Sequence, residues 1–405
     1  MTATGTEGRR QARKRGFRRA ALILGAGGAV ALAALLADGP LLALLLGIAC
    51  LIWAAWQLYQ PGGVPILVYH SVSPDAGWLP WARNTSVRPE VLRCHLAALR
   101  AGGWRVIATQ ELIQARQSGT ALPRRTVVLQ FDDAYLDNYL FAVPILREFS
   151  APAMFFASTD FIAEGESLRQ DARSQGAAAW AGYMNAAELR ALDADPLFTV
   201  EAHGTNHARI PVSDAPAETV QGDDWKPHAP LSWAKGEGNK SLWYKAATAP
   251  EILAPGCVLP CHDSALAGRW WRDGRAETEA EFRARVTAML TEAHGRLETV
   301  LGRAPNVMAW PFDRCDEVSL QAAYDAGFTA VTGGNGENRV GEAATVLSRI
   351  HLQDHAFGPG PLWLEALAVR ARAQAASGHW IWHVLVALAA RRRRRLLGAS
   401  GYGAP

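Results

Sequence analysis

The chain has 405 residues, of which 49% are hydrophobic and 20% charged. This composition excludes a disordered chain, and five cysteines are too few and odd in number for a dense disulfide framework. The net charge is only +3, and basic residues gather at the two ends, which indicates a membrane surface rather than nucleic acid as a partner.

The first sixty residues combine a basic end with two apolar runs. Residues 1–19 are rich in Arg, whereas residues 20–37 and 41–59 contain no charged side chain. Each run approaches the ~20 apolar residues that cross a bilayer. We therefore expect a basic cytoplasmic end, 1–19, followed by one or two transmembrane helices within residues 20–59. A signal-like segment with one anchor, or a single tilted crossing, is the alternative.

The number of crossings decides the side of the membrane on which the following domain lies. With two crossings, this domain would lie on the cytoplasmic side of the membrane, together with the basic end. No Lys or Arg occurs between Tyr59 and Arg83, a depletion typical of an external segment. We therefore expect a protein of the cytoplasmic (inner) membrane whose folded domain faces the extracytoplasmic side.

Residues 62–360 alternate between β-rich apolar runs and helical patterns. Strands are expected at residues 64–69, 104–108, 126–131, 153–157, 198–201 and 346–350, and helices at 89–101, 139–149 and 277–301. This alternation predicts an α/β fold in which parallel strands and crossover helices form a barrel. Between residues 211 and 275 the pattern fails, so we expect an irregular insertion there.

The C-terminal part, residues 361–405, ends in an apolar and then basic segment. Residues 379–390 (HWIWHVLVALAA) are too short to span a bilayer comfortably and lead directly into Arg391 to Arg395. We expect an interfacial helix whose arginines bind anionic lipid, followed by a basic tail; a short third crossing is the alternative.

Two adjacent carboxylates, Asp132 and Asp133, follow the expected strand TVVLQF. The carboxyl ends of parallel barrel strands are where catalytic groups gather. An Asp at this position can equally cap the next helix. A second motif favours chemistry, because His203 and His207 follow the expected strand at 198–201 in the segment EAHGTNH.

Imidazoles four residues apart converge on one cation if the backbone turns helically between them. One carboxylate with two imidazoles suits zinc or a similar divalent ion and leaves a position open for water, as in catalytic sites. A third motif, Met308 to Asp313 (MAWPFD), looks like another strand that ends in a proline-fixed loop. Such a loop can hold a backbone N–H toward a developing oxyanion.

These motifs, in this order, resemble the polysaccharide deacetylases of carbohydrate esterase family 4. The resemblance covers about Pro65 to His355 and is greatest to the subgroup that deacetylates poly-β-1,6-N-acetylglucosamine, through the segments ILVYHSV and ETEAEFRARV. It implies a distorted (β/α) barrel. It also implies a divalent metal, which we expect to be Zn²⁺, with Ni²⁺, Co²⁺, Fe²⁺ and Mn²⁺ as alternatives.

The resemblance also implies a role for individual residues. Asp132 would be the general base, and Asp133, His203 and His207 the metal ligands. Substrate and oxyanion contacts would come from three consecutive loop residues, Trp310, Pro311 and Phe312.

The loop departs from the family pattern, because Phe312 replaces the usual Tyr and Asp313 the usual Gly. Gly204 takes a place often held by Ser or Thr. The general acid would be His351, with His355 close behind it in the chain, and His70 would line the pocket. For each of these three histidines, a hydrogen-bonded loop position is the plainer interpretation. Arg349 would orient Asp132 or form a structural ion pair.

The insertion and Cys315, which lies beyond it, offer weaker candidates for a function. Cys257, Cys261 and Cys315, with His262, favour a disulfide or free thiols over a second metal site. Its tryptophans stack on sugar rings or anchor the insertion to the barrel; they are Trp225, Trp233, Trp243, Trp270 and Trp271.

The resemblance implies a metal-dependent hydrolase that removes N-acetyl groups from a polysaccharide containing N-acetylglucosamine and releases acetate. Polysaccharide synthesis or export proteins would be its further partners. Two other functions stay open. The departures at Phe312 and Asp313 favour a degenerate glycan-binding module of an envelope assembly, and related barrels hydrolyse other linear amides.

Overall fold

The computed structural model describes residues 3–398, apart from 38, 59–61, 235, 237, 340 and 380. Asp38 in the break between the apolar runs, Trp380, and the end of the basic tail therefore lie outside the described residues. The helices are α1 (Ala3–Leu36), α2 (Pro40–Leu58), α3 (Ala82–Thr85), α4 (Pro89–Ala101), α5 (Thr109–Ser118), α6 (Val143–Glu148), α7 (Ala177–Trp180), α8 (Ala186–Asp193), α9 (Glu279–Leu301), α10 (Glu317–Asp325), α11 (Leu362–Ala376) and α12 (Ile381–Leu397).

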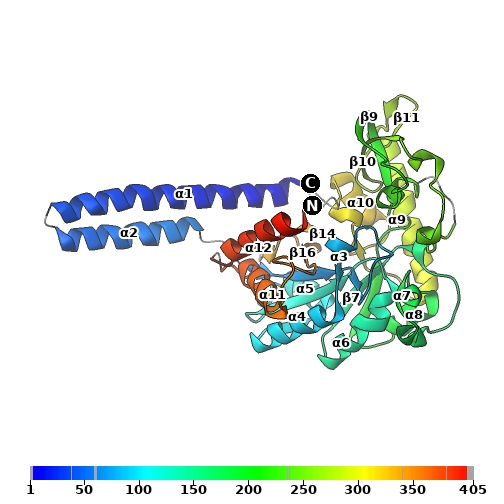
Figure 1. Ribbon diagram of the computed structural model, residues 1–405, viewed down its shortest axis with the longest axis horizontal. Coiled ribbons are helices and arrows are strands. Elements are labelled where there is room, and N and C mark those ends of the chain that lie inside the picture. Colours follow the sequence, from blue (N-terminus) through cyan, green and yellow to red (C-terminus); the bar gives the residue numbers. More distant parts are fainter. Residues whose placement is uncertain are drawn as a thin grey trace.

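Helices α1 and α2 form an antiparallel hairpin that projects from the rest of the molecule (Figure 1). Small residues let the two helices approach closely, since Ala20 and Ala54 are each only 3% exposed and a Cβ on Gly27 would overlap Cys50. Within α1, residues Arg15–Leu36 are long and apolar enough to cross a membrane, whereas the apolar part of α2, Pro40–Ala55, is shorter. The hairpin is thus consistent with a membrane anchor or a signal sequence.

The folded domain is built on parallel strands that close into a barrel. These strands are β2 (Ile66–Tyr69), β5 (Arg105–Ile107), β6 (Thr126–Phe131), β7 (Ala153–Ala157), β8 (Phe198–Ala202), β13 (Val307–Ala309), β14 (Ala330–Asn335) and β16 (Val346–His351). They pair in the order β2-β16-β14-β13-β8-β7-β6-β5, and β2 also pairs with β6. That pairing closes a ring of seven strands, with β5 beside the start of β6. The predicted α/β barrel is confirmed.

Two hydrophobic layers stabilise the barrel because successive side chains of a strand point to opposite faces. One layer includes Ile66, Val68, Val128 and Phe156, and the other packs the remaining strand faces against the helices around them. All six residues of β6 and all five of β7 are buried, as expected for strands covered on both sides. This explains why the sequence shows these strands as uninterrupted apolar runs.

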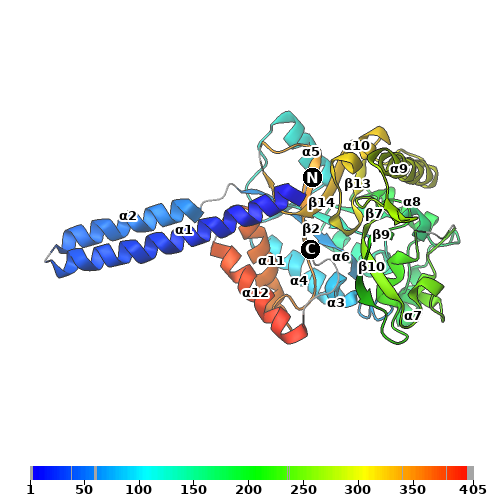
Figure 2. The same ribbon diagram turned by 90° about the horizontal axis from the view of Figure 1, so that it is seen from above.

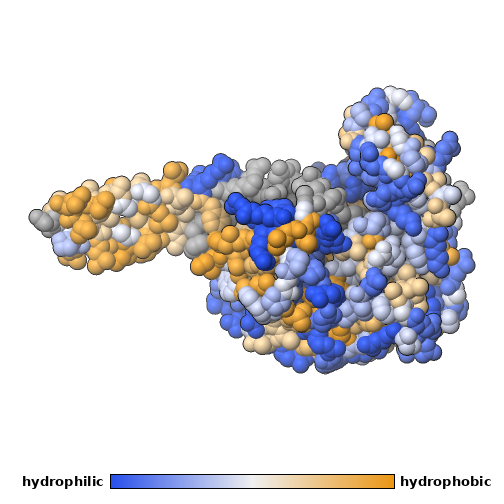
Figure 3. Space-filling model, viewed as in Figure 1, coloured by the Kyte–Doolittle hydropathy of each residue, from blue (hydrophilic) through white to orange (hydrophobic). Residues whose placement is uncertain are grey.

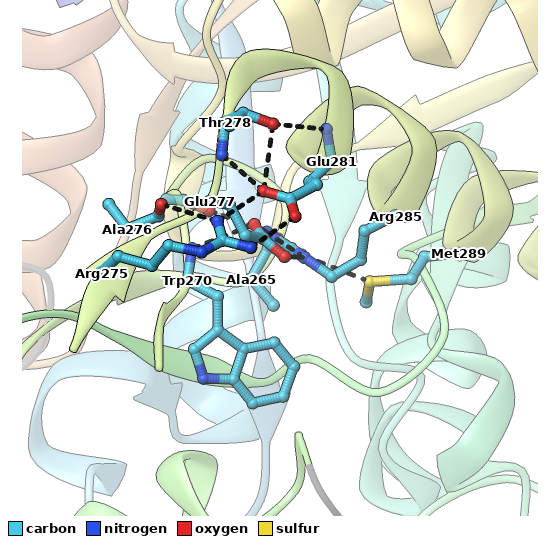
Figure 4. Close-up of polar contacts among 10 residues, drawn as sticks. Ala265, Trp270, Arg275, Ala276, Glu277, Thr278, Glu281, Arg285 and Met289 are labelled. Carbon is cyan, nitrogen blue, oxygen red and sulfur yellow. Dashed lines mark hydrogen bonds and ion pairs between the residues drawn. The ribbon is translucent and has the colours of Figure 1, made fainter. Parts of the chain in front are cut away.

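Helix α9 begins almost where the sequence predicts, and local polar contacts set its first residue (Figure 4). The Thr278 side chain accepts a hydrogen bond from the Glu281 backbone, while the Glu281 carboxylate accepts one from the Thr278 backbone. Arg275 pairs with Glu281, and Arg285 pairs with the buried Glu277. The predicted helix at 139–149 is instead a π-helical turn, Asn138–Ala142, followed by α6.

The insertion is more regular than its sequence indicates. Strand β9 (Arg209–Thr219) pairs antiparallel with β10 (Val258–Ser264) as a two-stranded ribbon, with 3₁₀ turns between them. Pro211 and Pro216 interrupt the strand pattern of β9, and a two-stranded ribbon tolerates them because each strand has an unpaired edge. Short pairs elsewhere are β1 (Gly63–Val64) with β15 (Asn338–Arg339), β3 (Ser71–Val72) with β4 (Ser86–Val87), and β11 (Trp271–Arg272) with β12 (Arg275–Ala276).

The C-terminal helices cover one side of the barrel. Helix α11 packs against α4, and α12 packs against α11 near the base of the hairpin (Figure 2). Of the arginines predicted to bind lipid, Arg393 is only 5% exposed and donates hydrogen bonds to Arg83 and Asn84, whereas its neighbours are exposed. The predicted C-terminal helix therefore exists, but Arg393 serves the fold.

Candidate metal centre and active site

The predicted site residues meet at the carboxyl end of the barrel. His70, Asp132 and His203 directly follow β2, β6 and β8, and Arg349 and His351 end β16. Side chains two or four residues apart on a strand point to the same side. His70, Asp132, Arg349 and His351 have this spacing from Val68, Val128 or Leu347, which belong to one hydrophobic layer, and His203 holds the corresponding position after β8. Strand alternation therefore turns all five toward one place.

Asp133 and two histidines form a buried cluster. Asp133 Oδ1 lies 3.5 Å from Nε2 of His203 and 3.5 Å from Nε2 of His207. One ligand atom from each residue lies within 4.8 Å of the others. The segment between the two histidines is not the helical turn that the sequence analysis assumed. The backbone is left-handed at Gly204 (φ 78°) and His207 (φ 46°), and these bends bring the imidazoles together.

The left-handed conformation also explains the glycine at position 204. A Cβ there would lie 3.3 Å from Leu266 and 3.5 Å from Met308 as well as requiring a positive φ. The Ser or Thr that the family often has at this position would be strained in this loop. The departure at Gly204 is thus a consequence of the local backbone.

The cluster fits a divalent ion. Ligand atoms about 2.0–2.2 Å from a tetrahedral ion are separated from one another by about 3.3–3.6 Å. The separations of 3.5 Å from Asp133 to each histidine fall in this range and are too long for good hydrogen bonds. Nδ1 of His203 lies 2.9 Å from the carbonyl oxygen of Ala309, a bond that leaves Nε2 to face Asp133.

The electrostatics of the cluster also favour a cation. Burial raises the pKa of Asp133, but its close polar contact with His203 and the charge of His207 outweigh burial and hold that pKa well below its usual range. Burial lowers the pKa of His207 to about 4. The site therefore offers an ionised carboxylate and a neutral imidazole, the forms that bind metal. Burial lowers the pKa of His203, but the charges of Asp132 and Asp133 raise it overall, so this negative site attracts positive charge.

Beside this cluster, a chain of ion pairs runs from Asp132 to His351. The buried Arg349 donates hydrogen bonds to Asp132 Oδ1 (2.7 Å) and to Asp313 Oδ1 (2.6 Å). The other oxygen of Asp313 pairs with Nε2 of His351. Burial raises the pKa of Asp132, but Arg349 and the nearby histidines keep it below its usual value. The second oxygen of Asp132, Oδ2, lies 3.7 Å from His70 Nε2.

Asp313 is the residue whose importance the sequence analysis missed. An aspartate in place of the usual glycine suggests that the turn is lost. The backbone is nevertheless left-handed at Asp313 (φ 56°), as it is at Phe312 (φ 59°). The carboxylate gains two partners, Arg349 and His351. Burial raises the pKa of Asp313, but these two positive neighbours hold it well below its usual range, so the residue is ionised.

The loop around Phe312 places an aromatic ring against the cluster of candidate ligands. The ring centre of Phe312 lies 4.4 Å from that of His207, and the guanidinium of Arg209 lies over the Phe312 ring, 4.3 Å from its centre. Trp310, by contrast, is buried in the core (1% exposed) and packs against Gly333. Trp310 therefore lies under the loop, whereas Phe312 lies against a candidate ligand.

A pocket beside the cluster is lined mainly by aromatic side chains. Besides Asp133, Ser158 and His207, its walls are Trp81, Tyr135, Phe161, Tyr183 and Trp233. Only Trp233 was singled out from the sequence. Tyr135 lies two residues after Asp133, and this closeness in the chain is the one sequence feature that could have placed Tyr135 at the pocket. The other aromatic residues come from distant segments.

The tryptophans of the insertion mainly anchor it to the barrel. Trp225 and Trp233 are buried (5% and 6% exposed), and Trp243 stacks on Trp81 with ring centres 5.4 Å apart. Of the insertion's tryptophans, only Trp233 reaches the pocket beside the metal cluster. These contacts fit anchoring, the second of the two expected roles, and Trp225 and Trp243 also line a second pocket together with Trp233.

Of the two expectations for the cysteines, a disulfide or thiols, the structure has thiols: none of Cys257, Cys261 and Cys315 forms a disulfide among the described residues. Cys257 immediately precedes β10 and Cys261 lies within it, so four extended residues hold them about 13 Å apart, too far for a disulfide. A second group of candidate ligand residues contains Asp354, His355 and Glu365. There Asp354 pairs with Arg88, so His355 belongs to a structural cluster outside the site.

Part of the chain is similar in sequence to known proteins. Residues 119–228 match the family model described as polysaccharide deacetylase. The chain is 23% identical over 284 residues to the poly-β-1,6-N-acetyl-D-glucosamine N-deacetylase of Escherichia coli K12, an alignment covering 69% of this chain and 35% of that protein. The chain thus spans about a third of the length of the curated relatives it matches.

Two solved structures are similar to this chain. A de-N-acetylase from Aggregatibacter actinomycetemcomitans has a TM-score of 0.49 at 18% identity and covers 71% of this chain and 94% of its own. The BpsB deacetylase domain from Bordetella bronchiseptica has a TM-score of 0.49 at 20% identity and covers 72% and 98%. The family match spans residues 119–228, which hold Asp133, His203 and His207, so this part of the chain is of the polysaccharide deacetylase family.

Proposed function

We propose that this protein hydrolyses N-acetyl groups of an N-acetylglucosamine polysaccharide and releases acetate. The observation that carries the proposal is the convergence of Asp133, His203 and His207 within 4.8 Å, with a further ionised carboxylate, Asp132, next in the chain. A metal site with a second carboxylate beside it that is not one of the ligands suits hydrolysis, because that carboxylate can act as a base. A module that only binds glycan needs no such carboxylate. The similarity to the E. coli enzyme supports a β-1,6-linked polymer as the substrate.

Asp133, His203 and His207 would hold the divalent ion, which we propose to be Zn²⁺ because the donor set is one carboxylate and two imidazoles. When bound, such an ion supplies positive charge that polarises the acetamide carbonyl and acidifies water. Asp132 takes the proton of the attacking water. Arg349 keeps Asp132 ionised and fixes its orientation through Oδ1, which leaves Oδ2 for the water.

His351 would protonate the leaving amine as the general acid. Its pairing with Asp313 orients the imidazole and compensates its positive charge. His70 lies across from it, with ring centres 5.4 Å apart, and would bind the sugar beside the reacting bond. The backbone N–H of Phe312 would stabilise the oxyanion, in a loop that Pro311 makes rigid. The aromatic pocket beside Asp133 and His207 would take the acetyl methyl group.

Acetate release from acetylated β-1,6-linked glucosamine oligomers and from chitooligosaccharides, with and without a chelator, tests the proposal. Chelator-sensitive release from the β-1,6 oligomers is the expected result. If the protein binds metal and glycan but releases no acetate from any polymer, the binding-module hypothesis replaces ours. Release only from simple acetamides would identify a hydrolase of another linear amide.

We also propose a division of the chain into functional segments. Residues 1–19 form the basic end, 20–59 the membrane anchor, 62–360 the barrel with its insertion at 211–275, and 361–405 the C-terminal helices and tail. Proteins of polysaccharide synthesis or export would be partners at the cytoplasmic membrane. An extracytoplasmic barrel stays our prediction, and it requires that only α1 crosses. The close packing of α2 on α1 favours the competing topology, in which both cross.

A further inference from the structure

Helix α12 exposes an apolar stripe that no part of the described chain covers. Ile381, Val384 and Leu388 are 61%, 43% and 55% exposed. They are three and four residues apart, so they lie on one face of the helix. Another face packs into the molecule through Ala389 and Leu385. Adjacent exposed apolar side chains on one helix face indicate an interaction surface.

The same helix continues into exposed arginines. Arg391, Arg394 and Arg395 are exposed, and positions 391 and 395 extend the stripe of positions 384 and 388 by further helical turns. The two arginines between them serve the fold, because Arg392 donates to the Phe357 carbonyl and Arg393 to the Arg83 carbonyl. One helix surface therefore changes from apolar to cationic along its length.

A backbone contact places the apolar end of α12 at the base of the hairpin. Helix α2 ends at Leu58, and a Cβ on Gly62 would lie only 2.2 Å from the carbonyl oxygen of Ser377. Ser377 follows α11, and α12 begins at Ile381. Four residues span at most about 14 Å. The link from Leu58 to Gly62 and the link from Ser377 to Ile381 are therefore both short. Figures 1 and 2 agree that α12 slopes away from the hairpin base.

Hydrophobic side chains cover the hairpin and continue onto the surface around its base (Figure 3). If both helices of the hairpin lie in a bilayer, the topology that their close packing favours, the first turns of α12 reach the boundary of that bilayer. The arginine end then lies on the aqueous side, where headgroup phosphates are the nearest anions. An apolar stripe followed by arginines matches acyl chains and anionic headgroups in that order.

We propose that α12 is a lipid-contact helix whose apolar stripe, Ile381, Val384 and Leu388, enters the acyl boundary while Arg391, Arg394 and Arg395 bind anionic phospholipid headgroups. This contact orients the barrel on the membrane surface in addition to the tether at residue 62. The inference does not depend on the proposed deacetylation, which is measured separately by acetate release.

The test uses the full chain in lipid nanodiscs, with the five cysteines replaced by alanine and one new cysteine carrying an environment-sensitive fluorophore. The label goes at Val384→Cys, and the matched control is Val258→Cys, a residue that is 61% exposed and lies on β10, a strand at the end of the molecule opposite the hairpin tip (Figure 1). We expect a blue-shifted emission at position 384, and quenching by spin-labelled lipid, with neither effect at position 258. Equal behaviour at the two positions would overturn the proposal.

A second arm tests the arginines, with the label kept at position 384. Adding phosphatidylglycerol to phosphatidylcholine nanodiscs should increase the quenching, and the triple variant R391Q/R394Q/R395Q should lose that increase. The control R124Q/R272Q/R283Q removes three exposed arginines elsewhere and should keep it. If both triple variants respond alike, the arginines do not bind headgroups. Binding of a nucleic acid by the same arginines with no lipid effect would assign this surface to another partner.

Discussion

Asp313 pairs with His351 through one oxygen of its carboxylate, while its other oxygen accepts hydrogen bonds from Arg349. Arg349 in turn donates to Asp132. The proposed acid and the proposed base are thus held by one continuous set of ion pairs. A residue that looks like a departure from the family pattern therefore connects the proposed base with the proposed acid.

We predict that Asp313→Asn lowers turnover by roughly tenfold to a hundredfold without loss of metal, because it removes the charge that orients His351. Acetate release and metal content by elemental analysis measure the two effects. Arg314→Gln, in the same loop, should leave both unchanged, since Arg314 pairs with Asp263 away from this chain. Full activity of Asp313→Asn would show that His351 needs no carboxylate.

The two adjacent carboxylates should respond differently to substitution. Asp133→Ala or His207→Ala should abolish metal uptake, since each supplies one of three ligand atoms. Asp132→Asn should keep the metal and lose roughly 10²–10⁴-fold in turnover, the range of a general base. His228→Ala, outside the cluster, is the control. An active Asp132→Asn variant would remove Asp132 from the base role.

Stability should fall between mildly acidic and mildly basic pH because of Asp137. This residue is buried beside Ser71 and Val72, and burial raises its pKa from 3.8 to about 7. The folded state therefore keeps a proton that the unfolded state has released, and the associated stability is lost as the pH rises through the folded pKa. Asp137→Asn should raise the melting temperature more at about pH 8 than at about pH 5.

The exposed Asp171→Asn serves as the control for this titration, and its melting temperature should follow that of the unmodified protein at both pH values. A difference between Asp137→Asn and the unmodified protein that does not change with pH would mean that Asp137 titrates normally.

Thiol labelling can show on which side of the membrane the barrel lies. In a cysteine-free background, Val258→Cys should react with an impermeant maleimide in cells stripped of their wall, because we expect one crossing and an external barrel. Labelling only after permeabilisation would mean that α2 crosses as well. A reporter fused after Pro405 gives an independent reading of the same face.

Much of the barrel could be predicted because its strands are buried on both faces. Continuous apolar runs such as Thr126 to Phe131 have few other interpretations between helical segments. The ribbon β9–β10 was missed because its two prolines and exposed polar residues resemble a loop. The π-helical turn at Asn138–Ala142 has the same composition as an α-helix, so only its hydrogen bonds distinguish it.

The site was predictable where residues follow strands directly. Asp132, Asp133 and His203 come straight from strand ends, so their convergence follows from the topology of a parallel barrel. The aromatic pocket was not predictable, because Trp81, Tyr183 and Trp233 come from separate loops whose packing depends on the whole fold. The function of Asp313 depends on a left-handed backbone at that residue, which the sequence pattern does not indicate for an aspartate.

Strand β2 pairs with β6 on one side and with β16 on the other. Its second neighbour is thus among the last strands to be synthesised, while β2 itself follows the hairpin directly. During translation the unfinished barrel must wait with an open edge, a state prone to aggregation and proteolysis. Damage to β16 should therefore appear first as a low yield of intact protein, even where the metal ligands are untouched.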